Sequence, residues 1–266
     1  MAGVSLNIME NNIYIVPDVH CRDFYKPVLK IKDKPIVFLG DYMDPYDYEG
    51  FTDKHGIKNL QEIIDFARNN KNVTLLVGNH DCSWIWDTLR WEHTSYLYYK
   101  ELHQLYRDNI DLFTSCIKLG DTLFTHAGVS DGWIDHINNM LEYKKSFLRL
   151  NQDNIVMYID NEFRNELLRD GTIRRGMSSP YLESPIFDVG AIRWGDSTYG
   201  GPFWDDIREY QDPEGWTIKQ IFSHTQLEKT GSSVTIGNGT CIDSRAIFEY
   251  DLDTHELIKS ELNEKD

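Results

Sequence analysis

The sequence has little of what marks secreted, zinc-knuckle or membrane proteins. Only four cysteines occur in 266 residues, and no two of them form a C-x-x-C pair, so neither a disulfide framework nor a zinc knuckle is indicated. No apolar run approaches the ~20 residues that a membrane span requires, and the N-terminus lacks the pattern of a secretory signal. We therefore expect a soluble, cytoplasmic protein with reduced thiols and no membrane partner.

Basic residues are scarce as well. The chain has 27 Lys and Arg against 43 Asp and Glu, which gives a formal net charge of −16. That charge repels nucleic-acid phosphates and anionic lipid surfaces. Linkers rich in Pro, Gly or Ser and low-complexity segments are absent from the sequence. A chain of this length can bury one large core, so we expect a single domain over residues 1–266. Because of the negative charge, we expect no nucleic-acid partner.

Five short polar motifs are present, most of them at the end of an apolar run. The runs are rich in β-branched and aromatic residues, which favour buried strands; they cover residues 13–16, 36–39, 73–77, 123–125 and 221–222. The motifs that follow are Asp18-x-His20, Gly40-Asp41-x-x-Asp44, Gly78-Asn79-His80-Asp81, His126-Ala127-Gly128 and Ser223-His224-Thr225. Open α/β sheets bind ligands at the carboxyl ends of their strands. Five strand ends that finish in Asp, Asn or His predict a two-metal site that cleaves phosphate esters.

Hydrophobic periodicity predicts helices between these runs. We expect helices over residues 57–68, 133–150 and 157–170, and a loop over 171–215. Residues 83–106 also fit a helix, with a broad face of Trp and Tyr. These aromatic residues fit the core or a cap over the site, because aromatic side chains bury large areas. The alternative is a platform that stacks on substrate.

The C-terminal part of the chain has strand patterns. Strands are expected over residues 233–236, 240–243, 246–252 and 256–262, and the Gly-Asn-Gly sequence at 237–239 predicts a hairpin turn between the first two. A second sheet packed on the first follows. The fold class is therefore α/β, a four-layer sandwich of two central mixed β-sheets flanked by helices, rather than a doubly wound sheet.

The order of the motifs resembles the calcineurin-like metallophosphoesterases. Residues 126–130, His-Ala-Gly-Val-Ser, are similar to the His-Gly-Gly-Leu-Ser of phosphoprotein phosphatases and bacterial diadenosine tetraphosphatases, and Ile242-Asp243-Ser244 is similar to their Ile-Asp-Thr-Gly. The single histidine of Ser223-His224-Thr225-Gln226, where most of the superfamily has Gly-His-x-His, points to the same branch. The resemblance covers roughly residues 13–249 and implies the metallophosphoesterase sandwich.

The resemblance implies a set of metal ligands. Carboxylate, imidazole and amide oxygen suit divalent first-row ions, and one carboxylate can bridge two of them. Asp41 would be the bridge, between one metal held with Asp18 and His20 and a second held with Asn79, His126 and His224. The expected cofactors are two divalent ions, Mn²⁺ or Fe, with Zn²⁺ as an alternative. A hydroxide shared by the two ions would attack the phosphorus.

The resemblance also assigns a proton donor and a phosphate grip. His80, paired with Asp44, would protonate the leaving oxygen. Asn79 would contact the phosphate. The family's arginine after the second Asp is missing, because Pro45 and Tyr46 follow Asp44 here. Arg193, which precedes Trp194, would carry more of the phosphate binding.

Arg22 and Arg245 are weaker candidates for the phosphate grip than Arg193. Cys21 stands where the family often has Gly, which is a smaller departure than the missing arginine.

Three functions are compatible with these residues. The first is a metal-dependent phosphomonoesterase resembling protein Ser/Thr phosphatases. The second is a nucleotide or diadenosine tetraphosphate hydrolase, with which the single-histidine ending and the aromatic segment agree. The third is a metal-binding interaction module without catalysis, since a fold does not guarantee activity. Retention of both His80 and Asp44 favours an enzyme, because a scaffold needs no proton donor. The expected partner is a phosphorylated protein, nucleotide or small molecule.

Overall fold

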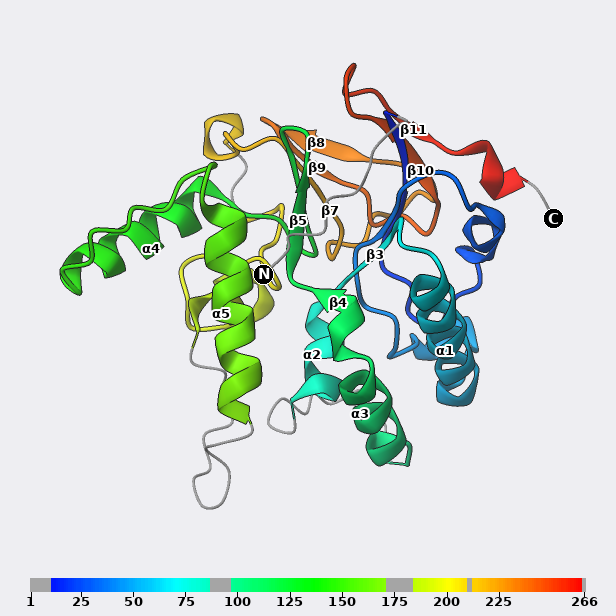
Figure 1. Ribbon diagram of the computed structural model, residues 1–266. Coiled ribbons are helices and arrows are strands. Elements are labelled where there is room, and N and C mark those ends of the chain that lie inside the picture. The colour runs from blue at the N-terminus through cyan, green and yellow to red at the C-terminus, as the bar shows by residue number, and fades with distance from the viewer. Residues whose placement is uncertain (1–10, 87–96, 171–183, 210–211, 265–266) are drawn as a thin grey trace.

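Two β-sheets form the centre of the protein (Figure 1). The computed structural model describes residues 11–86, 97–170, 184–209 and 212–264. Among these residues, one sheet has the strand order β11-β10-β1-β2-β3-β4 and the other has the order β5-β6-β7-β9-β8. The strands of the first sheet are β1 (Asn12–Val16), β2 (Ile36–Phe38), β3 (Val73–Leu76), β4 (Phe113–Thr114), β10 (Phe248–Asp251) and β11 (Leu257–Lys259). Those of the second are β5 (Cys116–Leu119), β6 (Thr122–Thr125), β7 (Gln220–Phe222), β8 (Val234–Ile236) and β9 (Gly239–Cys241).

Both sheets are mixed. In the first, β1 to β4 run parallel to their neighbours, whereas β10 is antiparallel to β1 and to β11. In the second, β6, β7 and β9 are parallel, and β5 and β8 pair antiparallel at the two edges. The carboxyl ends of β1, β2 and β3 therefore meet at one edge of the first sheet, and those of β6 and β7 meet at one edge of the second.

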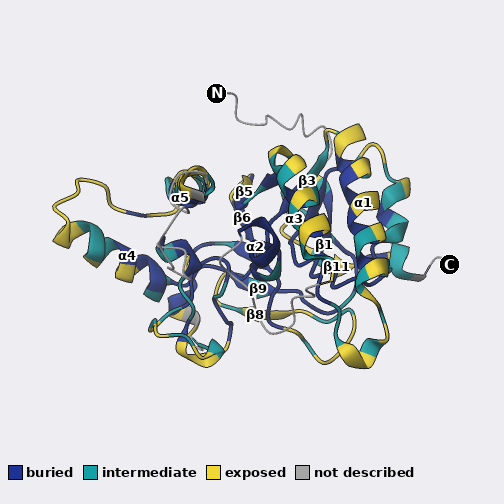
Figure 2. Ribbon diagram, turned by 90° about the horizontal axis from the view of Figure 1, so that it is seen from below, coloured by how far each residue is buried: buried dark blue, intermediate teal, exposed yellow. Residues whose placement is uncertain are grey.

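The two faces of each sheet bury different sets of side chains. Ile13, Ile15 and Val37 face the second sheet and pack in one cluster with Phe124 and Ile221. Residues of the opposite parity, such as Tyr14 and Phe38, belong to a second cluster that includes apolar side chains of the helices. Neighbouring strand residues point to opposite faces, so each sheet packs on the other sheet with one face and on helices with its other face. The protein therefore has four layers, in the order helices, sheet, sheet and helices. Figure 2 shows the buried strands between helices whose outer faces are exposed. The predicted sandwich is confirmed.

The described helices are α1 (Asp53–Asn69), α2 (Asn79–Ile85), α3 (Tyr99–Asp108), α4 (Asp131–Tyr143) and α5 (Ile155–Asp170). Of these, α1 and α4 begin at a residue whose side chain caps the helix. The Thr52 hydroxyl accepts a hydrogen bond from the N–H of His55 at the start of α1, and the Ser130 hydroxyl accepts one from Trp133 at the start of α4, as N-cap residues do. Buried residues of α1 recur at helical spacing; they are Leu60, Ile63, Ile64 and Ala67.

Most predicted elements are present with shifted ends. The helices expected over 57–68 and 157–170 are α1 and α5. The predicted hairpin at 237–239 is confirmed, because β8 and β9 pair antiparallel and Gly237 between them has φ +56°. The strand expected over 256–262 is only β11, followed by a 3₁₀ turn at Glu261–Glu264. Described residues of the predicted loop 171–215 form short 3₁₀ turns and one isolated bridge, Gly190 with Ser197.

Two expectations were wrong in part, and two strands were missed. The helix expected over 133–150 ends at Tyr143, where the chain turns with Lys145 at φ +55°. The aromatic segment is divided between α2 and α3, and residues 87–96 lie outside the described residues. Trp84, Trp86 and Tyr106 are fully buried, so they belong to the core. The short strands β4 and β5 were not predicted.

The four cysteines are free thiols and all are buried. Over the part of the chain that the structure describes, no helix is both long and apolar enough to cross a membrane.

Candidate metal centre

The five polar motifs converge where the two sheets present the carboxyl ends of their strands. Asp18 and His20 follow β1, Asp41 and Asp44 follow β2, Asn79 and His80 begin α2 after β3, His126 follows β6, and His224 follows β7. All of these side chains are buried except His80, which is half-buried. The strand ends therefore collect the predicted residues from both sheets at one place.

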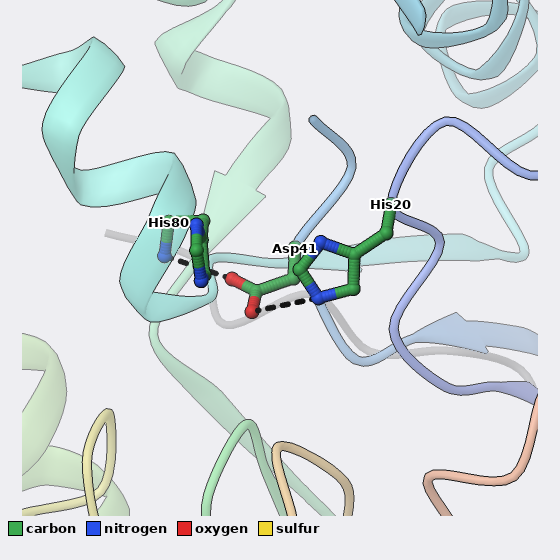
Figure 3. Close-up of side chains that lie close together, drawn as sticks. All are labelled: His20, Asp41 and His80. Atoms are coloured by element: carbon green, nitrogen blue, oxygen red, sulfur yellow. Dashed lines mark hydrogen bonds and ion pairs between the residues drawn. The ribbon is translucent and has the colours of Figure 1, made fainter. Parts of the chain in front are cut away.

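Asp41 lies between two groups of ligand atoms. In one group, single donor atoms of His20, Asp41 and His80 lie within 4.8 Å of one another, and in the other the same holds for Asp41, His126 and His224. Figure 3 shows the Asp41 carboxylate between the rings of His20 and His80. A carboxylate shared by two groups has the geometry that a bridging ligand requires.

Hydrogen bonds to the backbone fix the orientation of His20 in the first group. His20 Nδ1 lies 3.0 Å from the carbonyl oxygens of both Met43 and Asp44, so this nitrogen carries the proton and donates. The lone pair of Nε2 then faces carboxylates, 3.6 Å from Asp41 Oδ2 and 3.8 Å from Asp18 Oδ2. An imidazole whose other nitrogen donates to a carbonyl is the usual arrangement of a metal-ligating histidine. Asp18 also accepts hydrogen bonds through Oδ1 from the Ser223 hydroxyl and from the N–H of His224.

The second group repeats this arrangement on the other sheet. His126 Nδ1 donates to the carbonyl oxygen of Leu39 at 2.8 Å, which leaves Nε2 as the acceptor. Nε2 lies 2.9 Å from Asn79 Oδ1, 3.2 Å from His224 Nδ1 and 3.5 Å from Asp41 Oδ2. Burial lowers the pKa of His126 to about 4 and holds that of His224 well below its usual range. Both rings are therefore neutral, which is the protonation state that binds a metal.

Negative charge at the centre fits cations. Asp18, Asp41 and Asp243 are each at most 2% exposed. Burial and the negative charge of Asp18 hold the pKa of Asp243 well above its usual range. Burial does the same for Asp41, where the charges of Asp18 and Asp81 add to the effect against an opposing one from His80. Buried carboxylates that repel one another need counter-charge, and bound divalent ions would supply it.

His80 and Asp44 form an ion pair beside this centre. His80 Nδ1 lies 2.9 Å from Asp44 Oδ2, the Asp44 side chain is 1% exposed, and the His80 side chain is 23% exposed. Burial alone would lower the pKa of His80, but the charges of Asp41 and Asp44 and the hydrogen bond that His80 donates to Asp44 raise it to about 9. The N–H of His80 also donates to Asp41 Oδ1 at 2.9 Å. The ring is thus a cation near neutral pH, fixed beside the shared carboxylate and partly open to solvent.

Comparison with known proteins agrees with this geometry. The family model for calcineurin-like phosphoesterases matches residues 12–225. The chain belongs to the calcineurin-like phosphoesterase family. No curated protein sequence matches it. Among solved structures, it is similar to a protein serine/threonine phosphatase from Saccharomyces cerevisiae described as similar to human phosphatase PP5, with 12% identity over 96% of this chain and 82% of that one, and a TM-score of 0.47.

Two glycines let the phosphoesterase motifs approach each other. A Cβ on Gly40 would lie 2.4 Å from the Gly78 nitrogen, and a Cβ on Gly78 would lie 2.1 Å from Asp41 Oδ1. Gly40 also has φ +109°. The glycines before Asp41 and Asn79 are therefore required by the contact between two loops, which the sequence motif could not explain.

Asp81 joins the same loops, and the sequence analysis gave it no role. Its carboxylate accepts hydrogen bonds from the N–H groups of Gly78, Asp41 and Tyr42 at 2.8, 2.8 and 3.1 Å, and from the Tyr106 hydroxyl at 2.6 Å. The bond back to Gly78 is half of a capping box at the start of α2. The spacing of Gly78 and Asp81 contained this signal. Asp81 positions the Asp41 loop against the helix that carries Asn79 and His80.

Backbone strain is concentrated at the centre. His20, Asp41, Asp44 and His224 have φ of 42°, 51°, 62° and 65°, in the left-handed region that side chains other than glycine seldom occupy. Such residues are found where a surrounding structure enforces them, and they cluster at functional sites. Cys21, with φ 62°, shares this conformation, which explains why glycine is common at its position in the family.

Tyr46 occupies the region where the family's arginine is missing. Its ring lies 4.9 Å from that of His20, and the Arg22 guanidinium lies 5.3 Å from the Tyr46 ring centroid. Arg22 is buried, with Nε 2.8 Å from a carboxylate oxygen of Glu49. Arg22 Nη1 also donates to the Asp18 carbonyl oxygen at 3.4 Å, and its Nη2 is buried without a hydrogen-bond partner in the part of the chain that the structure describes. Glu49 therefore holds the Arg22 guanidinium beside the candidate ligand Asp18.

Arg193 lies beside the second group. Its Nη2 donates to the His224 carbonyl at 3.2 Å, and its Nε lies 2.7 Å from Asp206 Oδ2. Arg193, Tyr46 and His224 line one cavity of about 530 Å³. Arg245 instead donates to the carbonyl oxygens of Leu227 and Glu228. Arg193 therefore shares a cavity with a candidate metal ligand.

Proposed function

We propose that this protein is a metal-dependent phosphomonoesterase whose catalytic domain comprises the whole chain. The observation that carries the proposal is the position of Asp41, which lies between two histidine groups and next to the His80–Asp44 ion pair. Phosphate ester hydrolysis needs both features, because it requires charge neutralisation at the phosphate and a proton for the leaving oxygen.

The donor set fits two divalent cations. Asp18, His20 and Asp41 would hold one, and Asp41 together with Asn79, His126 and His224 would hold the other. When bound, two such ions supply neutralisation of the phosphate oxygens and lower the pKa of a coordinated water. Oxygen and imidazole donors in this mixture suit Mn²⁺ or Fe, and Zn²⁺ is compatible with them.

His80 is the proposed proton donor. The charges of Asp41 and of Asp44, which lies 2.9 Å away, keep its imidazole protonated, and the partly exposed ring can reach a substrate oxygen that solvent also reaches. Asp44 fixes the ring through Nδ1, so Nε2–H is the group that donates. Protonation of the leaving alkoxide by a positioned acid contributes typically 10²- to 10⁴-fold, as an order of magnitude.

The cavity beside His224 favours a phosphomonoester over a polyphosphate. Asp206 lies 2.7 Å from Arg193 and 2.6 Å from Arg208, so one carboxylate offsets part of the charge of both arginines. Glu228 lines the same cavity. Because this cavity has little excess positive charge, we propose that Arg193 and Asn79 bind a single phosphate group of the substrate. Diadenosine tetraphosphate and other nucleotides remain the second candidate substrates on the strength of the motif resemblance, and a noncatalytic metal-binding module is the third alternative.

The test is hydrolysis of p-nitrophenyl phosphate by manganese-loaded protein, repeated after chelation. Asp41→Asn should abolish activity and weaken metal binding, whereas His80→Asn should lower kcat about 10²-fold or more while metal binding is retained. His136→Asn, a change at an exposed histidine of α4, is the matched control and should leave both unchanged. Metal binding without turnover of this ester, of phosphopeptides or of diadenosine tetraphosphate would overturn the proposal in favour of the noncatalytic module.

A further inference from the structure

One end of α4 projects away from the body of the protein. The fully packed residues Trp133, Ile134 and Ile137 anchor the first half of the helix, and the partly buried Met140 and Leu141 pack against the same core before the helix ends. In Figures 1 and 2, α4 extends to the left beyond the two sheets, and Figure 2 shows its far end exposed. We call residues 142–149 the tip. Every residue of the tip is exposed.

The tip presents aromatic side chains to solvent. Tyr143 is 90% exposed and Phe147 is fully exposed, and Leu148 beside them is 38% exposed. Large apolar side chains that gather at one exposed place indicate an interaction surface more often than single exposed ones do.

The tip has a defined shape. The N–H of Lys145 donates to the Glu142 carbonyl at 2.8 Å, and that of Ser146 donates to the Leu141 carbonyl at 2.9 Å. The returning chain is fastened to α4, because the N–H of Leu150 donates to Asn138 Oδ1 at 2.7 Å and Asn138 Nδ2 donates to the Leu150 carbonyl at 3.1 Å. The aromatic and basic residues of the tip are thus held on a turn rather than on a loose end.

The charge of the tip is opposite to that of the whole protein. Lys144, Lys145 and Arg149 outweigh Glu142 there, in a chain whose net charge is −16. Within the described residues, none of these three basic side chains forms an ion pair. They are available to an acidic partner.

Residues of α4 that precede the tip line such an acidic surface. A cavity of about 530 Å³ is lined by four carboxylates, those of Asp131, Asp135, Asp212 and Glu214. Asp131 holds Thr217 through hydrogen bonds of 2.8 and 3.2 Å. None of the four makes a salt bridge to a lysine or arginine that the structure describes. The cavity follows α4 from Asp131 to Asn139 and ends three residues before the tip, and the two surfaces are complementary in charge.

We propose that the tip docks into the acidic cavity of a second copy of this chain. Every residue of the tip is exposed, so the tip does not occupy the cavity of its own chain. A two-fold axis across the middle of α4 would place two α4 helices antiparallel, so that each tip meets the cavity of the other copy. The contact is then made twice and closes on itself, as in most homodimers. Opposite charges within each contact fix the register of the pair.

The test is the oligomeric state of the full chain, measured by sedimentation velocity over a range of concentrations and at two salt concentrations. The wild type should dimerise, and higher salt should weaken the dimer because the contact is charged. Lys144→Glu with Lys145→Glu should raise the dissociation constant about tenfold or more. The matched control is Lys54→Glu with Lys58→Glu on α1, which makes the same change in net charge at exposed lysines and should leave the dimer intact.

Reversing the charges of the tip and of the acidic cavity together tests whether these two surfaces contact each other. Asp135→Lys with Glu214→Lys should also weaken the dimer, and combining these changes with the two glutamates at the tip should restore it. A wild-type chain that is monomeric at its highest soluble concentration would overturn the proposal, as would a dimer that ignores the tip substitutions. Binding of the monomer to anionic lipid vesicles through the tip would also overturn it and would assign the tip to a lipid surface. Because phosphatase activity is not the readout, these outcomes are separate from the test of the proposed function.

Discussion

Substitution of Gly40 by alanine should destabilise the protein strongly, because two backbone segments meet at this residue. A Cβ there would lie 2.4 Å from the Gly78 nitrogen and 2.7 Å from its Cα, and neither atom belongs to a flexible side chain. The backbone φ of +109° adds strain for any residue with a Cβ. Left-handed backbone costs about 1–2 kcal/mol for such a residue, and overpacking typically costs a further 1–3 kcal/mol or so. The expected loss in free energy of unfolding is therefore about 2–5 kcal/mol.

Gly120→Ala is the matched control. Gly120 has φ +59° in the turn between β5 and β6, and no atom lies within 4 Å of the position its Cβ would take. It should lose only the backbone contribution of about 1–2 kcal/mol. Urea denaturation of both variants in the presence of chelator, at equal m-values, measures the difference.

The Gly40 variant should also bind manganese more weakly in calorimetry, because a displaced loop moves Asp41. The reasoning would be refuted if Gly40→Ala were no more destabilising than Gly120→Ala, since the close approach to Gly78 would then contribute nothing.

Three further predictions concern the titration of His80, the phosphate grip and the thiols. In metal-free protein, NMR titration should give His80 a pKa near 9, and Asp44→Asn should lower that pKa by about 1–3 units. The stability that the raised pKa contributes is present below the unfolded value of about 6.5 and is lost as the pH rises through about 9. A His80 pKa that is the same in Asp44→Asn as in the wild type would contradict the pairing. Arg193→Ala should raise KM for p-nitrophenyl phosphate more than Cys21→Gly does, and equal, negligible effects would remove Arg193 from the site. Burial raises the pKa of all four thiols, which are those of Cys21, Cys82, Cys116 and Cys241. A thiol reagent at pH 8 should therefore label none of them in the native protein and four after denaturation. A thiol that reacts fast in the native protein would contradict this.

The position of the centre could be predicted from sequence because residue type and strand end coincide in it. Asp18 and Asp41 follow short apolar runs that form parallel neighbours in the first sheet, and such neighbours bring their carboxyl ends together. His126 follows a run of the second sheet, and the packing of the two sheets brings it to the same place. The α4 boundary could not be found in this way. Leu148 and Leu150 continue an apolar pattern beyond Tyr143, yet Leu150 is buried by a returning loop that Asn138 fastens to the helix.

Other features depend on contacts between segments that are distant in sequence. The role of Asp81 requires Tyr42 and Tyr106 to be its neighbours, and no local pattern indicates that. The two-residue strand β4 and the four-residue strand β5 are too short for periodicity to show. Left-handed φ at His20 and Asp41 is imposed by the surrounding fold, against the preference of those residues.

The ligands of the centre come from both sheets, and this division has a consequence for the survival of the protein in a cell. Asp18, Asp41 and Asn79 follow strands of the first sheet, whereas His126 and His224 follow strands of the second. Ions bound across that seam would act as cross-links between the two halves of the sandwich, and a ligand at 100 times its dissociation constant stabilises the native state by about 2.7 kcal/mol. A shortage of metal would then make the chain more susceptible to proteolysis as well as inactive. The amount of the protein in a cell, and not only its catalytic rate, would depend on the concentration of the ion.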